Sequence, residues 1–457
     1  MIIIVGAGIT GLSAGFELAT RGVPFQILEA SPRAGGLIHT EHAGGFTIEA
    51  GPESFLAQKP AALELCDALG LTPRLISTRT PRTAFVLKRG RLHPLPSPSV
   101  LGIPTTAAGI ARYDLLSPIA RARLAMEVLV PRGQGEDESV GSFFRRRFGP
   151  ETVGHIAEPL LGGIHAGDIE TLSMKALFPR FLEAEMRHGS VLRAFRHMPG
   201  TPPGDGLFRT LGRGMSELVE ALEQRLPVGS IWHESPVREI ARRGTGAVET
   251  WHVRTPAGDV SGDGVIFACP AFVTAAVLAT VDVGAAARCA EVPYASSAGV
   301  TLAWPLDAVS HPLQGSGFVV ARRSNALRIT ACTWVSSKWT GRAPEGSVLL
   351  RAFIGGSHDP GAVDLDDEHL VAIAVRELAD VLGIKGPPSM SSVARWRRAG
   401  AQHNVGHLAR VADIEGRLAA HRGLFVAGSG FRAVGIPDCI ADGREVAVRA
   451  ADCTKIR

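Results

Sequence analysis

A glycine pattern at the start of the chain has the spacing that binds a dinucleotide. The apolar run 2–5 is followed by Gly6, Gly8 and Gly11 in the order G-x-G-x-x-G. The first glycine makes the tight turn out of a strand, the second lets the backbone approach a pyrophosphate, and the third allows close packing of helix and strand. The N–H groups at the start of that helix can then bind phosphate. The predicted contacts of this loop are Gly6, Ala7, Gly8, Ile9, Thr10 and Gly11.

An acidic residue completes the pattern. Glu29 ends a second apolar run, 25–28, and lies 18 positions after Gly11. A carboxylate at this point accepts hydrogen bonds from ribose hydroxyls and repels the 2′-phosphate of NADP. The glycine run alone is weak support, but the strand, the spacing and the acid together predict a βαβ dinucleotide-binding unit.

A second glycine-rich run follows directly. It contains Arg33, Gly35 and Gly36. The double glycine allows close backbone approach to a ligand, and the guanidinium is a fixed cation that suits a pyrophosphate. An ordinary glycine turn with a surface arginine is the alternative interpretation. The predicted contacts of this run are Ala30, Arg33, Gly35, Gly36 and Leu37.

The run E-x-x-x-R-x-G-G after the βαβ unit resembles the second FAD contact of the flavin amine oxidase and porphyrinogen oxidase superfamily. Four further blocks are similar to the oxygen-dependent protoporphyrinogen and coproporphyrinogen oxidases of that superfamily, so the resemblance spans nearly the whole chain. These blocks are EAGPESF at 49–55, EPLLGGIHAGD at 158–168, FRTLGRGMSEL at 208–218 and GLFVAGSGFRAVGIPDCI at 423–440. The block at 158–168 is the most specific. Two places depart from the family pattern, Arg213 and the run Gln402-His403-Asn404.

The resemblance implies an α/β fold with a Rossmann-like FAD-binding domain, a mixed-sheet substrate domain and an α-helical insert, as in amine oxidase-like flavoproteins. We expect residues 1–74, 205–270 and 400–457 in the first domain, 75–93 and 271–399 in the second, and 94–204 in the insert. The cofactor implied is non-covalent FAD. Its further contacts, as the resemblance implies them, are Gly51, Pro52, Glu53, Ser54, Val237, Trp396, Ser429, Val434, Gly435 and Ile436. For the tryptophan, a place in the core is the alternative.

The activity implied is oxidation of protoporphyrinogen IX to protoporphyrin IX by O2, with release of hydrogen peroxide, in haem biosynthesis. Coproporphyrinogen III is a nearly level alternative substrate. More distant alternatives are an amine oxidase, a carotenoid desaturase, or a flavin or porphyrin carrier without turnover. We name no catalytic base, because the flavin itself accepts the hydride. The substrate-binding candidates are Arg91, in a predicted hairpin, and His165, for which a packed structural role is the alternative.

Composition fits a globular enzyme of two or three domains. The chain has 457 residues, of which 45% are hydrophobic and 20% charged, with a formal net charge of +4. We find no nucleic-acid module. The six cysteines show no metal-ligand spacing, so we expect no metal site and reduced thiols. Because the first strand begins at Ile2, we expect no leader segment and a cytoplasmic location.

Several segments bear on the fold and on membranes. Residues 83–95 predict a hairpin, 94–104 a proline-rich loop, and 105–197 helices, with Ser139 at a helix start and the cluster 199–204 closing the insert. The uncharged stretch 265–281 is predicted to be a strand and then a helix, because Pro270 divides it. Residues 68–113 contain seven basic and no acidic side chains before Asp114, which indicates a solvated face, a lipid contact or a substrate contact. We therefore expect peripheral association with the inner face of the cell membrane, and leave a homodimer open.

Overall fold

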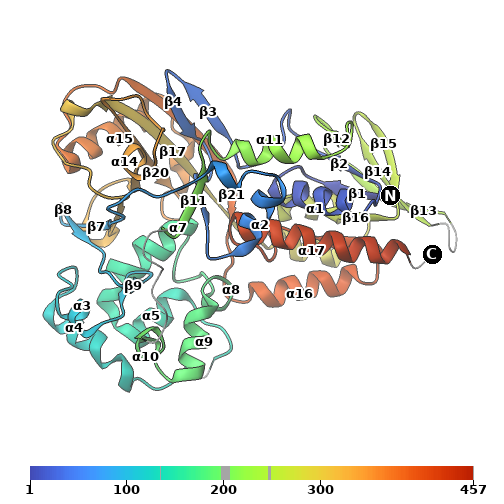
Figure 1. Ribbon diagram of the computed structural model, residues 1–457. Helices are drawn as coiled ribbons and strands as arrows, with labels where there is room; N and C mark the ends of the chain where they lie inside the picture. Colours follow the sequence, from blue (N-terminus) through green and yellow to red (C-terminus); the bar gives the residue numbers. More distant parts are fainter. Residues whose placement is uncertain (134, 197–205, 245–248, 456–457) are drawn as a thin grey trace.

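A five-stranded parallel sheet forms the region drawn at the right of Figure 1. The structure is a computed structural model that describes residues 1–133, 135–196, 206–244 and 249–455. The strands, in spatial order, are β12 (Ile231–Trp232), β2 (Phe25–Leu28), β1 (Ile2–Val5), β16 (Gly264–Phe267) and β22 (Leu424–Val426). Neighbouring strands are parallel throughout.

Helices cover both faces of this sheet, as a buried parallel sheet requires. In β1, Ile2 and Ile4 pack on one face, and Ile3 and Val5 pack on the other. The helices of the first face are α1 (Ile9–Thr20), α2 (Pro60–Ala68), α11 (Ser216–Arg225) and α17 (Ile436–Lys455). The helices of the second face are α12 (Ala271–Leu278), α13 (Val283–Ala290) and α16 (His407–Leu418). A three-stranded antiparallel sheet, β13 (Glu239–Arg243), β14 (Thr250–Thr255) and β15 (Gly258–Gly262), joins the second core.

A seven-stranded mixed sheet forms the second region, at the upper left of Figure 1. Its order is β21 (Met390–Ala401), β17 (Tyr294–Pro305), β20 (Ser347–Gly355), β19 (Ile329–Trp334), β18 (Gly317–Val320), β7 (Ala84–Lys88) and β8 (Arg91–Pro94). Only β18 and β7 pair in parallel among these strands of the described chain. Helix α15 (Asp367–Leu382) packs in the core of this sheet, and α14 (Val335–Lys338) follows β19. The predicted hairpin is confirmed, with Arg89 and Gly90 at positive φ in its turn.

Helices at the lower left of Figure 1, below the mixed sheet, form the predicted insert. They are α3 (Ala107–Ala111), α4 (Pro118–Ala125), η2 (Met126–Leu129), α5 (Val140–Phe148), α6 (Pro150–Thr152), the π-helix η3 (Val153–Gly162), α7 (Gly163–His165), α8 (Met174–Leu177), α9 (Pro179–His188) and α10 (Val191–Arg196). Phe143, Phe144, Phe148, Phe181 and Phe195 pack as an aromatic cluster in their core. The predicted helix start is confirmed, because the Ser139 hydroxyl accepts a hydrogen bond from the Ser142 N–H.

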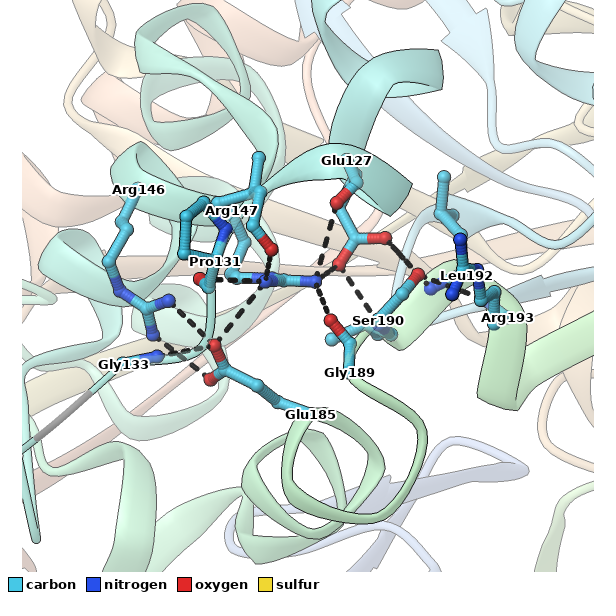
Figure 2. Close-up of polar contacts among 12 residues, drawn as sticks. Glu127, Pro131, Gly133, Arg146, Arg147, Glu185, Gly189, Ser190, Leu192 and Arg193 are labelled. Carbon is cyan, nitrogen blue, oxygen red and sulfur yellow. Dashed lines mark hydrogen bonds and ion pairs between the residues drawn. The ribbon is translucent and has the colours of Figure 1, made fainter.

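A buried ion-pair network, shown in Figure 2, joins several elements of the insert. The guanidinium of Arg147 lies between the carboxylates of Glu127 and Glu185, and the Arg147 and Glu127 side chains are both 0% exposed. Arg147 also donates to the carbonyl oxygens of Val130 at 2.9 Å and Gly189 at 3.1 Å. These contacts tie η2 and the loop after it to α5, α9 and the start of α10.

Short strands link the regions. They are β3 (Thr40–Ala43) with β4 (Phe46–Glu49), β5 (Phe55–Leu56) with β11 (Phe208–Leu211) and β6 (Leu75–Ser77), and β9 (Ser99–Val100) with β10 (Ile103–Pro104). The last pair corrects the expectation of an irregular loop over 94–104, because Val100 pairs with Ile103 across a tight turn. Short 3-10 helices are η1 (Thr72–Arg74), η5 (Leu306–Ala308), η6 (Arg322–Ser324) and η7 (Pro360–Asp364).

The division into three domains stays a prediction. The expected end of the insert, in the cluster 199–204, lies outside the described residues. Helices α12 and α13 pack in the core of the parallel sheet, which favours a boundary near residue 293 over the expected one at 271. The stretch 265–281 forms β16 and then α12, as predicted. Within the described ranges, none of the helices has the length and apolarity needed to cross a membrane.

Candidate functional site

The two glycine-rich runs lie against each other at the carboxyl end of β1. Gly6 has a φ of +102°, and a Cβ on Gly11 would overlap the Gly6 carbonyl oxygen. The Gly35 N–H donates to the Ala7 carbonyl at 2.8 Å, and a Cβ on Gly36 would come within 3.2 Å of the Gly8 Cα. A Cβ on Gly8 would meet no atom of the described chain within 4 Å. The glycines therefore shape the turn, while Gly8 keeps one side of the loop open for close approach by a ligand.

Glu29 lies where the sequence predicts, at the end of β2. Its Oε2 accepts from the Ala7 N–H at 2.7 Å, and its Oε1 accepts from the Ser31 N–H at 2.8 Å. Oε1 also accepts from the Ser31 hydroxyl at 2.7 Å, whereas Oε2 has a second lone pair for a further donor. The acid therefore orders both loops and can still accept a hydroxyl. Ala30, the next residue, and Leu37, in the second glycine run, are exposed, while Ile9 and Thr10 are buried in α1.

Arg33 makes contacts that its sequence interpretation did not include. Its guanidinium donates to the carbonyl oxygens of Ala34 at 3.1 Å, Ile38 at 3.0 Å and Gly36 at 2.8 Å. The side chain thus closes its own loop. Direct binding of a pyrophosphate by Arg33 stays a prediction.

The closing segment 427–436 reaches the same end of the sheet. The Gly428 N–H donates to Asp442 Oδ2 at 2.6 Å, and the Val434 N–H donates to Asp438 Oδ2 at 3.2 Å. Ser429 and Gly435 are exposed, Val434 is half-buried, and Ile436 starts α17. A Cβ on Gly443 of α17 would overlap the backbone of Thr10 in α1. Two helices that begin at this edge, α1 and α17, therefore pack closely side by side, an arrangement that suits an anionic ligand.

The segment 49–54 joins this edge to the mixed sheet. The Arg351 guanidinium donates to the carbonyl oxygens of Gly51 and Ala50, each at 2.6 Å, and Trp396 Nε1 donates to the same Ala50 oxygen at 2.7 Å. A Cβ on Gly51 would overlap the Leu37 carbonyl oxygen, so Gly51 allows the segment to lie on the second glycine run. The half-buried residues Pro52 and Ser54 continue the chain toward β5.

Two carboxylates belong to this segment, the buried Glu49 and the half-buried Glu53. Lys338 forms an ion pair with Glu53; burial alone would raise the pKa of Glu53, but Lys338 and Arg351 lower it. Burial raises the pKa of Glu49 to about 7, although Arg342, 3.6 Å away, acts in the opposite direction. The closer partners of Glu49 are the Thr40 hydroxyl and the Met215 N–H, each at 2.8 Å.

Trp396 and His165 both face the junction of the regions. Trp396 is half-buried in β21 and is bound to segment 49–54 as described. His165 ends α7, packs edge-on against Phe178 at 5.7 Å, and its carbonyl accepts from Gln402 Nε2 at 2.9 Å. Burial, with a contribution from His403, lowers the pKa of His165 to about 4. The His165 ring is therefore neutral near pH 7 and can offer a hydrogen bond without a charge.

Of two other predicted site residues, Val237 lies near the candidate site and Arg91 does not. Val237 is half-buried. Two positions earlier, the Ser235 N–H donates to the Glu29 carbonyl at 2.7 Å. This hydrogen bond holds the segment that contains Val237 near the predicted ribose site. Arg91 is exposed on β8, at the opposite edge of the mixed sheet from Trp396 in β21. Six strand spacings of about 4.8 Å place the two edges about 29 Å apart. The structure does not bring Arg91 to this junction.

Sequence reasoning missed the cations that hold the junction. Lys338, Arg342 and Arg351 belong to no block that pointed to the site, since they contact it only after the mixed sheet folds. It also did not anticipate Arg74, which pairs with the buried carboxylate of Glu217. Part of the basic stretch 68–113 thus has an internal structural role.

Comparisons with known proteins agree with this geometry. Residues 9–451 match the family model described as flavin containing amine oxidoreductase. The chain is 37% identical to coproporphyrinogen III oxidase of Bacillus subtilis, with 97% of this chain and 96% of that protein covered. It is 30% identical to chloroplastic protoporphyrinogen oxidase of Nicotiana tabacum, covering 97% and 84%. A crystal structure from Exiguobacterium, provisionally assigned as a protoporphyrinogen oxidase, superposes with a TM-score of 0.88 at 32% identity, covering 99% and 98%. The chain therefore belongs to the flavin-containing amine oxidoreductase family, in the group that includes the porphyrinogen oxidases.

Proposed function

We propose that this protein is an FAD-dependent oxidase that converts a porphyrinogen to the corresponding porphyrin, with O2 as electron acceptor. Three two-electron oxidations remove six electrons and six protons from the porphyrinogen, and three O2 molecules take them up as three molecules of hydrogen peroxide. FAD, when bound, supplies the acceptor for each electron pair. The observation that carries the proposal is the convergence of both glycine runs, the start of α17 and segment 49–54 at one edge of the parallel sheet.

The residues present fit FAD. The open side of Gly8 and the starts of α1 and α17 suit the pyrophosphate. Glu29 suits a ribose diol and disfavours a 2′-phosphate. Val237 offers an apolar contact near Glu29 for the adenine end, and Trp396 with segment 49–54 suits the flavin end.

The work of the protein in this reaction is to bind and orient. Arg351 and Trp396 both donate to the Ala50 carbonyl, so they would fix the backbone of segment 49–54 against the flavin end of FAD. His165, as a neutral ring, can bind a pyrrole or a carboxylate of the substrate without adding a charge. No side chain is assigned as a base, because porphyrinogen pyrroles carry their own N–H groups.

The choice between two porphyrinogens is part of the proposal. The relatives that are 37%, 34% and 31% identical are named coproporphyrinogen III oxidase, and the 30% relative is named protoporphyrinogen oxidase. These names support coproporphyrinogen III more strongly than the sequence motifs did. Protoporphyrinogen IX, the first choice from the motifs, is now the second candidate substrate.

The direct test measures peroxide release from the purified protein with coproporphyrinogen III, protoporphyrinogen IX, a polyamine and no substrate. We expect porphyrin and peroxide in a ratio of one to three with at least one porphyrinogen, and a higher kcat/KM with coproporphyrinogen III. Oxidation of the polyamine alone would identify an amine oxidase. FAD binding without turnover of any of these substrates would favour a carrier.

The cofactor site has its own test. The Cβ of Gly8→Val would meet no atom within 4 Å beyond its chain neighbours, so we expect the protein to fold, while the side chain blocks close approach by the pyrophosphate. We expect the purified variant to lose bound FAD, measured by its absorbance near 450 nm. Gly361→Val, at another glycine with open space and no positive φ, is the matched control and should keep FAD. Full FAD content in Gly8→Val would contradict the site.

We further propose a cytoplasmic protein that associates peripherally with membranes. Ile119 and Leu129 of the insert are 83% and 75% exposed, and Met126 lies between them in the chain. Arg112 and Arg132 are exposed in flanking segments, which suits an anionic lipid surface. Binding to vesicles that contain anionic lipid, and its loss in Ile119→Ser/Leu129→Ser, would support this; no binding at low salt would contradict it. A homodimer stays an open prediction that sedimentation can test.

A further inference from the structure

Two histidines hold the backbone of the closing segment. His403 Nε2 lies 2.9 Å from the carbonyl oxygen of Ser429, and His407 Nε2 lies 2.6 Å from the carbonyl oxygen of Phe431. A carbonyl oxygen only accepts hydrogen bonds, so each Nε2 carries a proton and donates. The two donors therefore fix both ends of the turn 429–431.

The two imidazoles form one buried unit. Their rings are stacked with centroids 3.9 Å apart and planes 10° from parallel. His403 is 3% exposed and His407 0%. Burial lowers the pKa of both rings, that of His407 to about 3, and His403 itself and Arg410 act in the same direction on His407. Both rings are therefore neutral near pH 7, which is the state in which two stacked imidazoles do not repel each other.

The same unit is anchored outside the closing segment. The Ser173 N–H of the insert donates to the His403 carbonyl at 2.8 Å, and His407 is the first residue of α16. Gln402, the residue before His403, donates from Nε2 to the His165 carbonyl. The histidines thus connect the insert and the end of β21 to the turn that leads into α17.

The rest of the closing segment is held from the other side. Asp442 accepts from the Gly428 N–H and Asp438 accepts from the Val434 N–H, and both carboxylates belong to α17. Without the imidazole donors, the Ser429 and Phe431 carbonyl oxygens would lose these hydrogen bonds, and the turn would be held by its own backbone, by α17 and by the packing of the Phe431 side chain in the core. A shift in this turn would move Val434, Gly435 and the start of α17 together.

We propose that His403 and His407 are positioning residues for the cofactor: they hold the carbonyl oxygens of Ser429 and Phe431 so that the start of α17 meets FAD in the binding geometry. This inference rests on the proposed function, because FAD is taken as the ligand of the closing segment. Neither ring is assigned a contact with the cofactor.

The test compares Gln with Met at each position. These two side chains have similar length and flexibility, but only Gln can place a donor near the position of Nε2. We would titrate FAD into apoprotein prepared from the wild type and the four single variants, and record flavin fluorescence quenching and the visible circular dichroism of the bound flavin. Loss of one hydrogen bond is expected to weaken FAD binding about tenfold. We expect this loss and an altered dichroism spectrum in His403→Met and His407→Met, with binding largely restored in the Gln variants.

The control and the outcomes separate this inference from the proposed function. The control is His421→Met. His421 lies just beyond the other end of α16, where its Nε2 is 3.0 Å from Asp282 Oδ2. This variant should keep wild-type FAD affinity and spectrum. Equal behaviour of the Gln and Met variants at a position, whether both bind or both fail, would overturn the role of its donor. Failure of the wild type itself to bind FAD would instead overturn the proposed function.

Discussion

Two buried ion networks in this protein serve different ends. In the insert, Arg147 and Glu127 face each other with no exposed surface, and Arg146 and Glu185 extend the pair (Figure 2). At the junction between the sheets, Glu49 and Glu53 lie among Lys338, Arg342 and Arg351. Both networks place carboxylates and cations away from water, where an unpaired charge is costly.

The networks differ in whether their arginines donate to carboxylates, since the direct ion pair at the junction is made by a lysine, Lys338, with Glu53. In the insert, arginines donate directly to carboxylates; burial alone would raise the pKa of Glu185, but the hydrogen bonds from Arg146 and the Gly133 N–H lower it. At the junction, Arg342 donates to the Thr210 hydroxyl and the Leu211 carbonyl, and the pKa of Glu49 is raised.

The atoms without partners differ in the same way. Among the described residues, Arg147 has one buried nitrogen without a hydrogen-bond partner, whereas Arg342 has two and Glu53 has one such oxygen. The insert network joins η2, α5 and α9, whereas the junction network also holds the Gly51 and Ala50 carbonyl oxygens of the candidate site.

Breaking the insert network should have the largest effect on stability. Arg147→Met leaves Glu127 buried without its cation, so we expect the free energy of unfolding to fall by about 3–5 kcal/mol. Denaturant titration measures the change. FAD affinity of the folded protein should stay near that of the wild type, because the hydrogen bonds and ion pairs of the network within the described ranges reach no residue of the candidate site.

Arg145→Met is the matched control, since this neighbouring arginine forms an exposed pair with Glu170. Its effect should be about 1 kcal/mol or less. The double change Glu127→Gln/Arg147→Met should recover part of the lost stability, because no unpaired charge remains. A single change no worse than the control would show that the insert does not depend on this pair.

Breaking the junction network should lower the free energy of unfolding less than breaking the insert network does, but it should weaken FAD binding more. Arg351→Met removes two charge-assisted hydrogen bonds to the Gly51 and Ala50 carbonyls, so we expect a loss of about 2–3 kcal/mol and weaker FAD binding. Arg397→Met, which removes an exposed arginine of β21 that pairs with Asp364, is the control. An Arg351 variant that is destabilised but binds FAD as the wild type does would make this network purely structural.

The pH dependence of the junction should be the most specific effect. The pKa of Glu49 is about 7 in the folded protein against an ordinary 4.5, so the folded state binds the extra proton between these values. Its contribution to stability is therefore greatest below about pH 4.5 and is lost as the pH rises toward 7. Arg342, Glu53, the Thr40 hydroxyl and the Met215 N–H are the groups around it.

Glu49→Gln tests this sign. The free energy of unfolding of the variant minus that of the wild type should rise between pH 4.5 and 7, with a slope of at most about 1.4 kcal/mol per pH unit for one proton. The exposed acid Glu41, on the same hairpin, supplies the control variant Glu41→Gln. A difference that does not change with pH would mean that Glu49 is already ionised across this range.

The local signals in the sequence predicted several elements correctly. The G-x-G-x-x-G run forms the turn between β1 and α1, and Glu29 ends β2 beside it. Ser139 starts α5, and Pro270 separates β16 from α12. Each of these features depends on neighbours within a few residues, so spacing and residue type were sufficient.

Contacts between distant segments could not be obtained in that way. Arg91 stands in a correctly predicted hairpin, yet the order of the mixed sheet places it at the edge opposite Trp396. Arg33 was predicted to meet a pyrophosphate, and in the fold its guanidinium also closes its own loop. A sequence motif indicates which chemical groups are present, but not which partners they contact in the folded protein.

The sequence by itself determined the dinucleotide-binding opening, the helical insert and the resemblance to porphyrinogen oxidases, because glycine turns, helix caps and block order are local properties of the chain. Only the tertiary structure decided that Arg351 and Trp396 hold segment 49–54, and that His403 and His407 hold the turn before α17. These partners are tens to hundreds of positions apart. Their hydrogen bonds form only when packing of the two sheets and the insert brings them within about 3 Å of each other.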